Sequence, residues 1–214
     1  DTASELMQRH GGTVHGHACD IRDPDAIHSM VDTIWSHGPL TGVVNNAAGN
    51  FISRTEDLSV GGFNAISDIV FRGSFYVTLD IGKRLIAEGR RASFLSILTT
   101  WIWNGGPFVV PSAMSKAGLN AMTQSLAVEW APKVRLNTIA AGMIRTEQAH
   151  LHYGDEAAIA RVSATVPLGR LGTPGDVGDA CLFLCSPLAR YISGANLLLH
   201  GGGLVSLLGK LCLY

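Results

Sequence analysis

The sequence LTGVVNNAAGN, residues 40–50, carries the pattern on which the interpretation of the fold depends. It opens with a short apolar run, 40–45, that predicts a buried strand, and continues with small and amide residues, 46–50, that predict a loop. The segment 93–98, SFLSIL, repeats the pattern and is followed by the polar and indole side chains of 99–101. Strands that end in loops of this kind are typical of α/β proteins, which bind ligands outside the carboxyl ends of parallel strands.

Helical and strand patterns alternate along the whole chain. Strands are predicted over 13–19, 40–45, 93–98, 134–140 and 195–199. Helices are predicted over 1–10, 24–37, 62–88 and 113–130, with shorter helical stretches near 147–163 and 176–184. Pro24 is suited to open the second helix, because proline needs no hydrogen-bonded N–H in the first turn. The order predicts an α/β fold, a doubly wound, mostly parallel, Rossmann-like sheet in a single domain over 1–214.

Composition excludes several classes of protein. The chain has 214 residues, of which 47% are hydrophobic and 15% charged, so it can bury a core without disulfides or metal ions. Sixteen Lys and Arg against seventeen Asp and Glu give a net charge of −1, which lacks the basic footprint of a nucleic-acid-binding protein. No apolar run reaches the roughly 18 residues of a membrane span, so no membrane association is predicted.

The cysteines point to a reducing compartment. Cys19, Cys181, Cys185 and Cys212 are too few and too scattered for a disulfide framework. Cys181 and Cys185 stand four apart in a helical stretch, where we expect them to share a buried face. The sequence begins at Asp1 without a signal peptide, and a cytoplasmic location is the expectation.

Four segments should form the rim of a ligand site at the carboxyl edge of the sheet. They are the strand-end loops 45–50, 99–101 and 141–146, and the helix start 112–116. Each is rich in small or hydrogen-bonding residues.

These segments carry a resemblance to a known family. Asn45–Gly49 resembles the Asn-Asn-Ala-Gly signature of the short-chain dehydrogenase/reductase family, and Lys116 resembles its catalytic lysine. Asp20 is similar to the strand-end aspartate that touches the adenine, and Gly142 with Thr146 is similar to the segment beside the nicotinamide. The likeness runs from about residue 10 to about residue 203. It implies a nicotinamide cofactor held by Asp20, Asn46, Ala47, Ala48, Lys116, Gly142, Met143, Ile144 and Thr146.

Within the family, the sequence is most similar to the 2,4-dienoyl-CoA reductases. The runs 45–53 and 108–113 resemble theirs, and Ser112 stands four residues before Lys116, where most family members have tyrosine. This resemblance implies hydride transfer to a conjugated enoyl- or dienoyl-CoA thioester. The implied cofactor is NADP, with NADPH as the hydride donor, and NAD is the alternative.

Three features depart from the family pattern. No Gly-x-Gly-x-x-Gly occurs in the sequence, so the resemblance implies a fold truncated at its N-terminus, with the first βαβ segment preceding the chain. Trp101 stands eleven residues before Ser112, where the reductases have a tyrosine. An indole N–H can donate a hydrogen bond but cannot act as a general acid, so the proton is expected to come from water. Val70 replaces an active-site Asn of ordinary family members.

The catalytic candidates are Asn50, Lys116, Trp101, Thr99 and Ser112. Asn50 is predicted to polarise the thioester carbonyl, or else to be an ordinary loop amide beside Gly49. Lys116 is expected to bind the nicotinamide ribose, against the alternative of a surface lysine. Thr99 either orients substrate or simply ends a strand, and Trp101 either walls the acyl pocket or covers the edge of the core.

Two other functions stay open on sequence alone. One is a short-chain dehydrogenase acting on an alcohol or ketone, although Tyr76, Tyr153, Tyr191 and Tyr214 all lie in other elements. The other is a catalytically inactive homologue that only binds nucleotide.

Two further expectations concern partners and metals. Small residues along the predicted helix 113–130 favour close helix contact and a homo-oligomer, either a tetramer or a dimer. No metal site is predicted, because His150 and His152 have no carboxylate at metal-ligand spacing.

Overall fold

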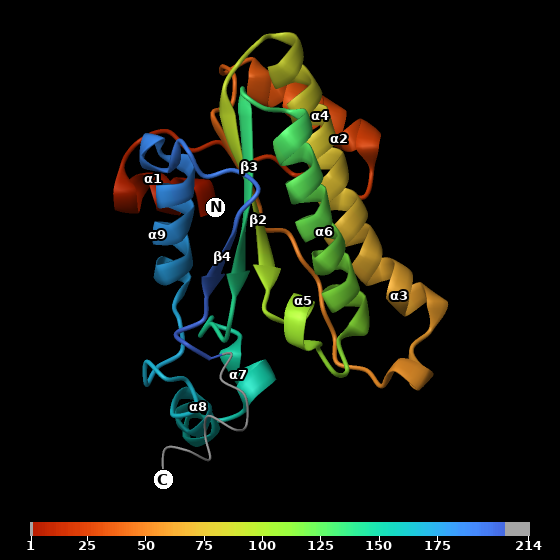
Figure 1. The fold of residues 1–214 in the computed structure, drawn as a ribbon, viewed down its shortest axis with the longest axis vertical. Helices are drawn as coiled ribbons and strands as arrows, with labels where there is room; N and C mark the ends of the chain where they lie inside the picture. The colour runs from red at the N-terminus through yellow and green to blue at the C-terminus, as the bar shows by residue number, and fades with distance from the viewer. Residues whose placement is uncertain (1, 204–214) are drawn as a thin grey trace.

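The computed structural model describes residues 2–203, folded around one parallel sheet (Figure 1). Its four strands lie in the order β1-β2-β3-β4. They are β1 (Gly42–Asn45), β2 (Ala92–Thr99), β3 (Val134–Ala141) and β4 (Asn196–Leu199). The α/β class and the parallel sheet predicted from the sequence are therefore confirmed.

The ladder between β2 and β3 is the centre of the fold. It runs from Ala92 beside Val134 to Thr99 beside Ala141. Phe94 is 2% exposed and Leu95 is fully buried, although successive side chains of a strand point to opposite faces. Both faces of β2 are therefore covered, as parallel sheets require.

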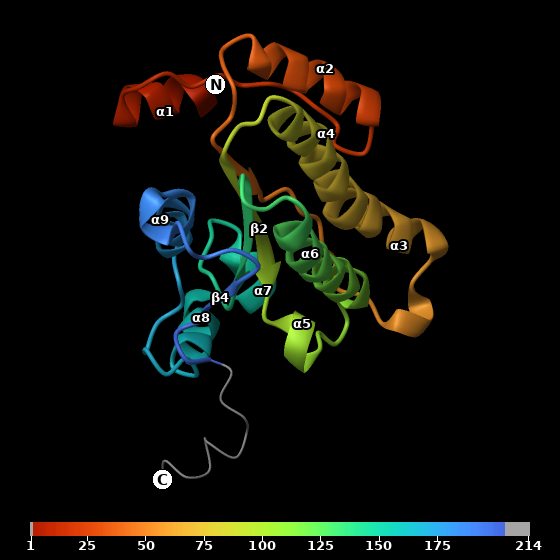
Figure 2. The ribbon, with the colours of Figure 1, turned by 45° about the horizontal axis from the view of Figure 1, so that its top comes forward.

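Helices supply the two covering layers. The α-helices are α1 (Thr2–His10), α2 (Pro24–Trp35), α3 (Val60–Ser67), α4 (Ser74–Ala87), α5 (Trp101–Asn104), α6 (Val110–Glu129), α7 (Ala149–Tyr153), α8 (Glu156–Ser163) and α9 (Pro174–Cys185). Short 3-10 turns form η1 (Thr55–Asp57) and η3 (Pro187–Ala189). In both ribbon views α2, α4 and α6 lie on one side of the sheet and α9 on the other (Figures 1 and 2). This arrangement is the doubly wound layering that the sequence predicts.

Local chemistry explains where the predicted helices begin and break. Asp23 caps α2, because its carboxylate accepts hydrogen bonds from the N–H groups of Asp25 and Ala26, and Pro24 opens the helix as predicted. The predicted helix 62–88 is helical as far as Ala87, but a π-helical turn, η2 (Asp68–Gly73), joins α3 to α4. The stretch 147–163 is divided into α7 and α8 at Gly154, whose φ of 90° ends the first helix.

The predicted strand over 13–19 is wrong. These residues are extended coil and mostly exposed, and no strand among residues 2–203 lies beside them. A strand is stable only when a neighbour completes its hydrogen bonds, and the local sequence pattern cannot supply that neighbour.

Cys181 and Cys185 share a buried face, as predicted. Both pack against the core cluster that contains Leu95, Ile139 and Leu184, and burial raises the pKa of both thiols. The three cysteines that the structure describes form no disulfide, and Cys212 lies outside the described residues.

Gly82 lies where α4 packs on the core, so a substitution at this position tests the packing. A Cβ there would overlap the indole of Trp130, which packs edge-on against Phe94 with 6.0 Å between ring centroids. We expect Gly82→Ala to lower the free energy of unfolding, measured by urea denaturation, by about 1–3 kcal/mol through overpacking.

Gly178→Ala is the matched control, because Gly178 is an exposed α9 position with nothing within 4 Å of an added Cβ. It should stabilise the protein by up to about 1 kcal/mol through helix propensity. Equal effects of the two substitutions would contradict the packing described here.

Candidate active site

The carboxyl ends of β2, β3 and β4 open onto one hollow of about 370 Å³. Thr99, Thr100 and Trp101 line it from the end of β2, and Gly142 and Met143 from the end of β3. The remaining walls come from Asn104, Tyr153, His200 and Gly203. The edge that the sequence predicted as a ligand rim is therefore hollowed where three strands end.

Backbone hydrogen bonds hold this edge together. The N–H of Thr100 donates to the carbonyl of Ala141 over 3.3 Å, and the N–H of Gly142 donates to the carbonyl of Leu199 over 2.9 Å. A Cβ at Gly142 would lie 2.7 Å from the Cβ of His200, so only glycine permits this approach of the two segments.

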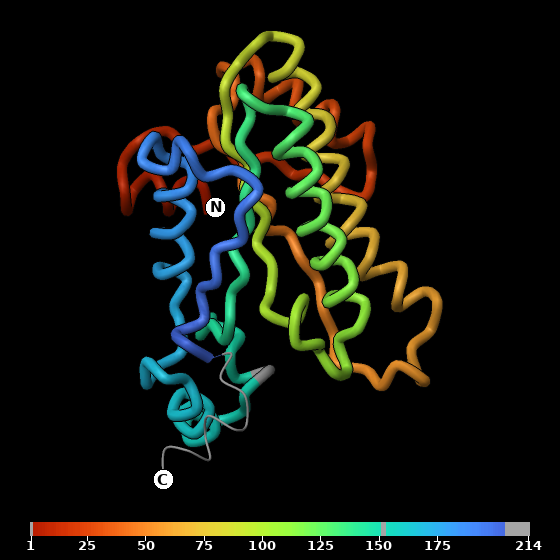
Figure 3. The backbone as a smooth tube through the Cα atoms, in the orientation of Figure 1, coloured from red at the N-terminus to blue at the C-terminus, as the bar shows by residue number. Residues whose placement is uncertain are grey.

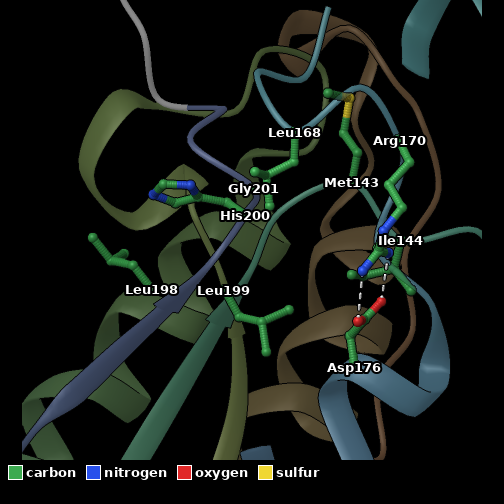
Figure 4. Close-up of a pocket in the computed structure, with 10 residues that line it drawn as sticks. Met143, Ile144, Leu168, Arg170, Asp176, Leu198, Leu199, His200 and Gly201 are labelled. Atoms are coloured by element: carbon green, nitrogen blue, oxygen red, sulfur yellow. Dashed lines mark hydrogen bonds and ion pairs between the residues drawn. The ribbon is translucent and has the colours of Figure 1, made fainter. Parts of the chain in front are cut away.

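A second hollow of about 310 Å³ borders the first and shares Met143 and His200 with it (Figure 4). Ile144 lines this second hollow. Hydrogen bonds hold the backbone on both sides of Ile144. The N–H of Gly172 donates to the carbonyl of Met143 over 3.0 Å, and the N–H of Arg145 donates to the carbonyl of Gly172 over 2.8 Å. The segment 142–145 therefore has a fixed course between the two hollows.

One wall of the second hollow is held by an ion pair. Arg170 donates through Nη1 and Nη2 to the two carboxylate oxygens of Asp176, each over 2.8 Å, as the dashed lines in Figure 4 mark. Asp176 also accepts from the N–H and hydroxyl of Thr173, which caps α9. These donors hold the pKa of Asp176 well below its usual range.

Lys116 projects from α6 toward β2. Its Nζ donates to the carbonyl of Ile97 over 2.6 Å, and burial lowers its pKa from the usual 10.5 to about 8. No carboxylate among the described residues forms an ion pair with it. Ser112, one turn earlier, is 3% exposed.

The loop after β1 lies against the segment that leads into α6, as the tube in Figure 3 traces. The N–H of Ser53 donates to the carbonyl of Phe108 over 3.0 Å, and Phe108 itself has a φ of 65°, a strained value for an aromatic residue. Asn45 is the amide that anchors this strand end, because its Nδ2 donates to the buried hydroxyl of Thr78 over 2.8 Å. Asn46, Ala47, Ala48 and Asn50 are exposed.

Asp20 lies at the end of a coil, since the strand expected before it does not form. Its carboxylate accepts from the guanidinium of Arg22 over 2.6 to 3.0 Å, which lowers its pKa to about 2. Thr146 is exposed, and its carbonyl accepts from the N–H of Ala149 over 3.0 Å.

The structure thus brings part of the predicted site together. Thr99, Trp101, Gly142 and Met143 line one hollow, and Ile144 lines its neighbour. Neither hollow is lined by the remaining candidates, which are Asn50, Lys116, Ser112, Asp20, Asn46, Ala47, Ala48 and Thr146. Their roles stay predictions.

Sequence reasoning missed Asn104, Tyr153 and His200. His200 directly follows the last predicted strand, so the strand-end rule would have found it, and Asn104 begins the stretch Asn-Gly-Gly-Pro, whose residue types are typical of a loop. Tyr153 belongs to no motif, and only the folding of α7 against the strand ends brings it here.

Two of these residues are hydrogen-bonding groups whose donor atoms can be assigned. Burial raises the pKa of Tyr153, partly offset by a hydrogen bond to the backbone of Ile144, so the phenol keeps its proton at neutral pH. The N–H of Gly202 donates to Nδ1 of His200 over 3.0 Å, so in the neutral ring Nε2 carries the proton.

Comparison with known proteins identifies the fold family. A family model described as enoyl-(acyl carrier protein) reductase matches residues 1–203. A crystal structure of a short chain dehydrogenase from Bacillus anthracis superposes with a TM-score of 0.83 at 37% identity, covering 96% of this chain and 83% of that one. The chain belongs to the short-chain dehydrogenase/reductase family.

Two curated members of this family are similar over most of the chain. A probable (3E)-enoyl-CoA-producing 2,4-dienoyl-CoA reductase of Caenorhabditis elegans is 40% identical over 94% of this chain and 67% of its own length. A probable (2E)-enoyl-CoA-producing 2,4-dienoyl-CoA reductase of Bacillus subtilis is 37% identical over 94% of this chain and 81% of its own length. The chain thus spans about two thirds of the nematode relative.

Members of the short-chain dehydrogenase/reductase family are nicotinamide-dependent oxidoreductases, and the hollow at the strand ends lies where α/β folds bind such ligands. Among residues 2–203, no helix is long and apolar enough to cross a membrane. Within the same residues, no group of three or more His, Cys, Asp or Glu side chains is arranged to hold a metal ion.

The buried ammonium of Lys116 predicts a specific dependence of stability on pH. Because its pKa is about 8 in the folded chain and 10.5 when unfolded, the unfolded state binds more protons between these values. We expect the free energy of unfolding of the wild type, relative to Lys116→Met, to rise between pH 8 and pH 10 by up to about 3 kcal/mol.

Urea denaturation at a series of pH values measures this difference. Lys83→Met removes an exposed lysine from α4 and serves as the control, and its curve should run parallel to that of the wild type. If the curve of Lys116→Met also ran parallel to that of the wild type, the result would contradict the burial of the Lys116 ammonium at a cost in free energy.

Proposed function

We propose that the protein reduces a conjugated enoyl- or dienoyl-CoA thioester with a nicotinamide cofactor. The observation that carries this proposal is the gathering of Thr99, Trp101 and Tyr153 with the backbone of 142–143 around one hollow at the carboxyl edge. The names of the C. elegans and B. subtilis relatives, both probable 2,4-dienoyl-CoA reductases, favour the acyl-CoA substrate.

This reduction needs a hydrogen-bond donor at the thioester oxygen and a proton donor for the enolate. A bound nicotinamide supplies the hydride. Hydride addition to a conjugated thioester places negative charge on the thioester oxygen, which a preorganised donor stabilises more strongly in the transition state than in the ground state. We assign this role to the amide of Asn50 and the indole N–H of Trp101.

The second requirement is a proton for the enolate. Water was the source expected from sequence, because Trp101 replaces the tyrosine of the related reductases. Tyr153 lines the hollow and keeps its phenol proton at neutral pH, so it is the side chain there best suited to deliver a proton directly or through water.

The residues of this chain fit the nicotinamide half of the cofactor. The buried ammonium of Lys116, without a carboxylate partner among the described residues, suits the ribose hydroxyls. We assign the segment 142–144, which lines the two hollows, and Thr146 to the nicotinamide. Asp20 fits less well, because Arg22 holds its carboxylate. We propose NADP rather than NAD, and a Gly-rich turn ahead of residue 1 for the pyrophosphate.

We also propose that the protein forms a homo-oligomer, either a tetramer or a dimer, and that it is located in the cytoplasm. Support comes from exposed apolar side chains on α3, η2 and α6, namely Val60, Phe71, Met114 and Val128. Light scattering on the purified protein measures the oligomeric state, and a monomer at micromolar concentration would contradict it.

A second candidate function is a short-chain dehydrogenase that acts on an alcohol or ketone. The presence of the Tyr153 phenol in the same hollow as the Thr99 hydroxyl favours it, because that pair can donate to a ketone oxygen. A nucleotide-binding homologue without turnover is the remaining alternative.

An assay of cofactor oxidation separates these functions. The chain, extended at its N-terminus by the proposed Gly-rich segment, is incubated with NADPH and either a 2,4-dienoyl-CoA or a simple ketone, and absorbance is followed at 340 nm. We expect turnover of the thioester, and Tyr153→Phe should lower kcat about 100-fold or more.

Tyr191→Phe is the matched control, because Tyr191 is fully exposed and does not line the hollow around Thr99. This substitution should leave kcat unchanged. Turnover of the ketone alone would favour the dehydrogenase. Binding of NADPH without turnover of either compound would favour the inactive homologue.

A further inference from the structure

A separate cavity of about 390 Å³ lies at the amino edge of the sheet, opposite the candidate active site. Ala92 and Ser93, at the start of β2, line it, whereas Thr99, at the end of the same strand, lines the active-site hollow. The two are separated by about 20 Å of strand, at 3.3 Å per residue. A small ligand cannot contact both.

Hydrogen bonds fix the walls of this amino-edge cavity. The N–H of Ser93 donates to the carbonyl of Thr41 over 3.0 Å, and the N–H of Ala92 donates to the carbonyl of Lys133 over 3.3 Å. The buried hydroxyl of Ser93 donates to the carbonyl of Leu184 over 3.2 Å, which ties the end of α9 to the sheet. Segments from four parts of the chain therefore converge here with fixed backbones.

Four cationic side chains and no carboxylate line the cavity. The cations are Arg91, Lys133, Arg135 and Arg190. Arg135 donates to the carbonyls of Leu184 and Ile192 over 2.9 and 3.1 Å, so its charge is placed by backbone groups and is not neutralised.

The other three cations form no ion pair with any residue of 2–203, unlike most of the arginines elsewhere on the surface. This local excess of positive charge contrasts with the net charge of −1 for the whole chain. A concave surface lined by one sign of charge raises the local concentration of ions of the opposite sign.

We propose that the amino-edge cavity binds a small ligand carrying a phosphoryl group or a diphosphate. Guanidinium groups present paired donors that match phosphate oxygens, and lysine adds a point charge. The volume lies within the range of small-molecule sites, and the apolar faces of Ala92 and Pro132 leave room for an attached organic group. This site is independent of the proposed reductase activity, because it shares no residue with the carboxyl-edge hollows.

Calorimetric titration with sodium pyrophosphate, in the absence of nicotinamide and acyl-CoA, tests the proposal. We expect saturable binding to the wild-type chain at 50 mM NaCl that weakens at 300 mM NaCl, because the contacts are ionic. Arg91→Gln combined with Arg190→Gln should raise Kd at least tenfold. Both side chains are exposed, so the double variant should fold as the wild type does.

Lys83→Gln combined with Arg161→Gln removes the same charge from exposed positions outside the cavity, and Kd should change less than twofold. No saturable binding below 10 mM would overturn the proposal. Binding that both double variants weaken equally would overturn it as well.

Discussion

The parallel ladder between β2 and β3 is the constraint on which the rest of the structure depends. Both strands are buried on both faces, so their side chains form the core, and only their ends are free to carry chemistry. Because the strands run in the same direction, all their carboxyl ends meet at one edge and all their amino ends at the other. One ladder therefore positions the hollow around Thr99 and, at the opposite edge, the cluster of cations around Arg135.

Burial at the carboxyl edge sets the properties of its titratable groups. Lys116 loses solvation and has its pKa lowered, whereas Tyr153 loses solvation and has its pKa raised, since burial disfavours the charged form of each. At neutral pH the Tyr153 phenol keeps a proton that it can deliver, and Lys116, with a pKa of about 8, is still mostly an ammonium. Arg22 and Asp20 are exposed and form a simple surface pair instead.

Local patterns predicted most of the fold, because the signals for helices and buried strands come from residues that are close together in the sequence. Pro24 after Asp23 marked the start of α2, and the apolar run 93–98 marked β2. The strand expected over 13–19 failed because pairing is a property of two segments, and the pattern describes only one. In the site, the strand-end rule found Thr99 and the segment 142–144. The rule did not find Tyr153, because α7 reaches the strand ends only through tertiary packing.

The central claim is that the nicotinamide and the thioester meet in the hollow at the carboxyl edge. Hydrogen exchange with mass spectrometry, on the N-terminally extended protein with and without NADPH and an unreactive acyl-CoA, measures this most directly. The account predicts slower exchange of the backbone amides over 99–104 and 141–153. Slower exchange confined to segments that do not border this hollow, with 99–104 and 141–153 unaffected, would contradict it.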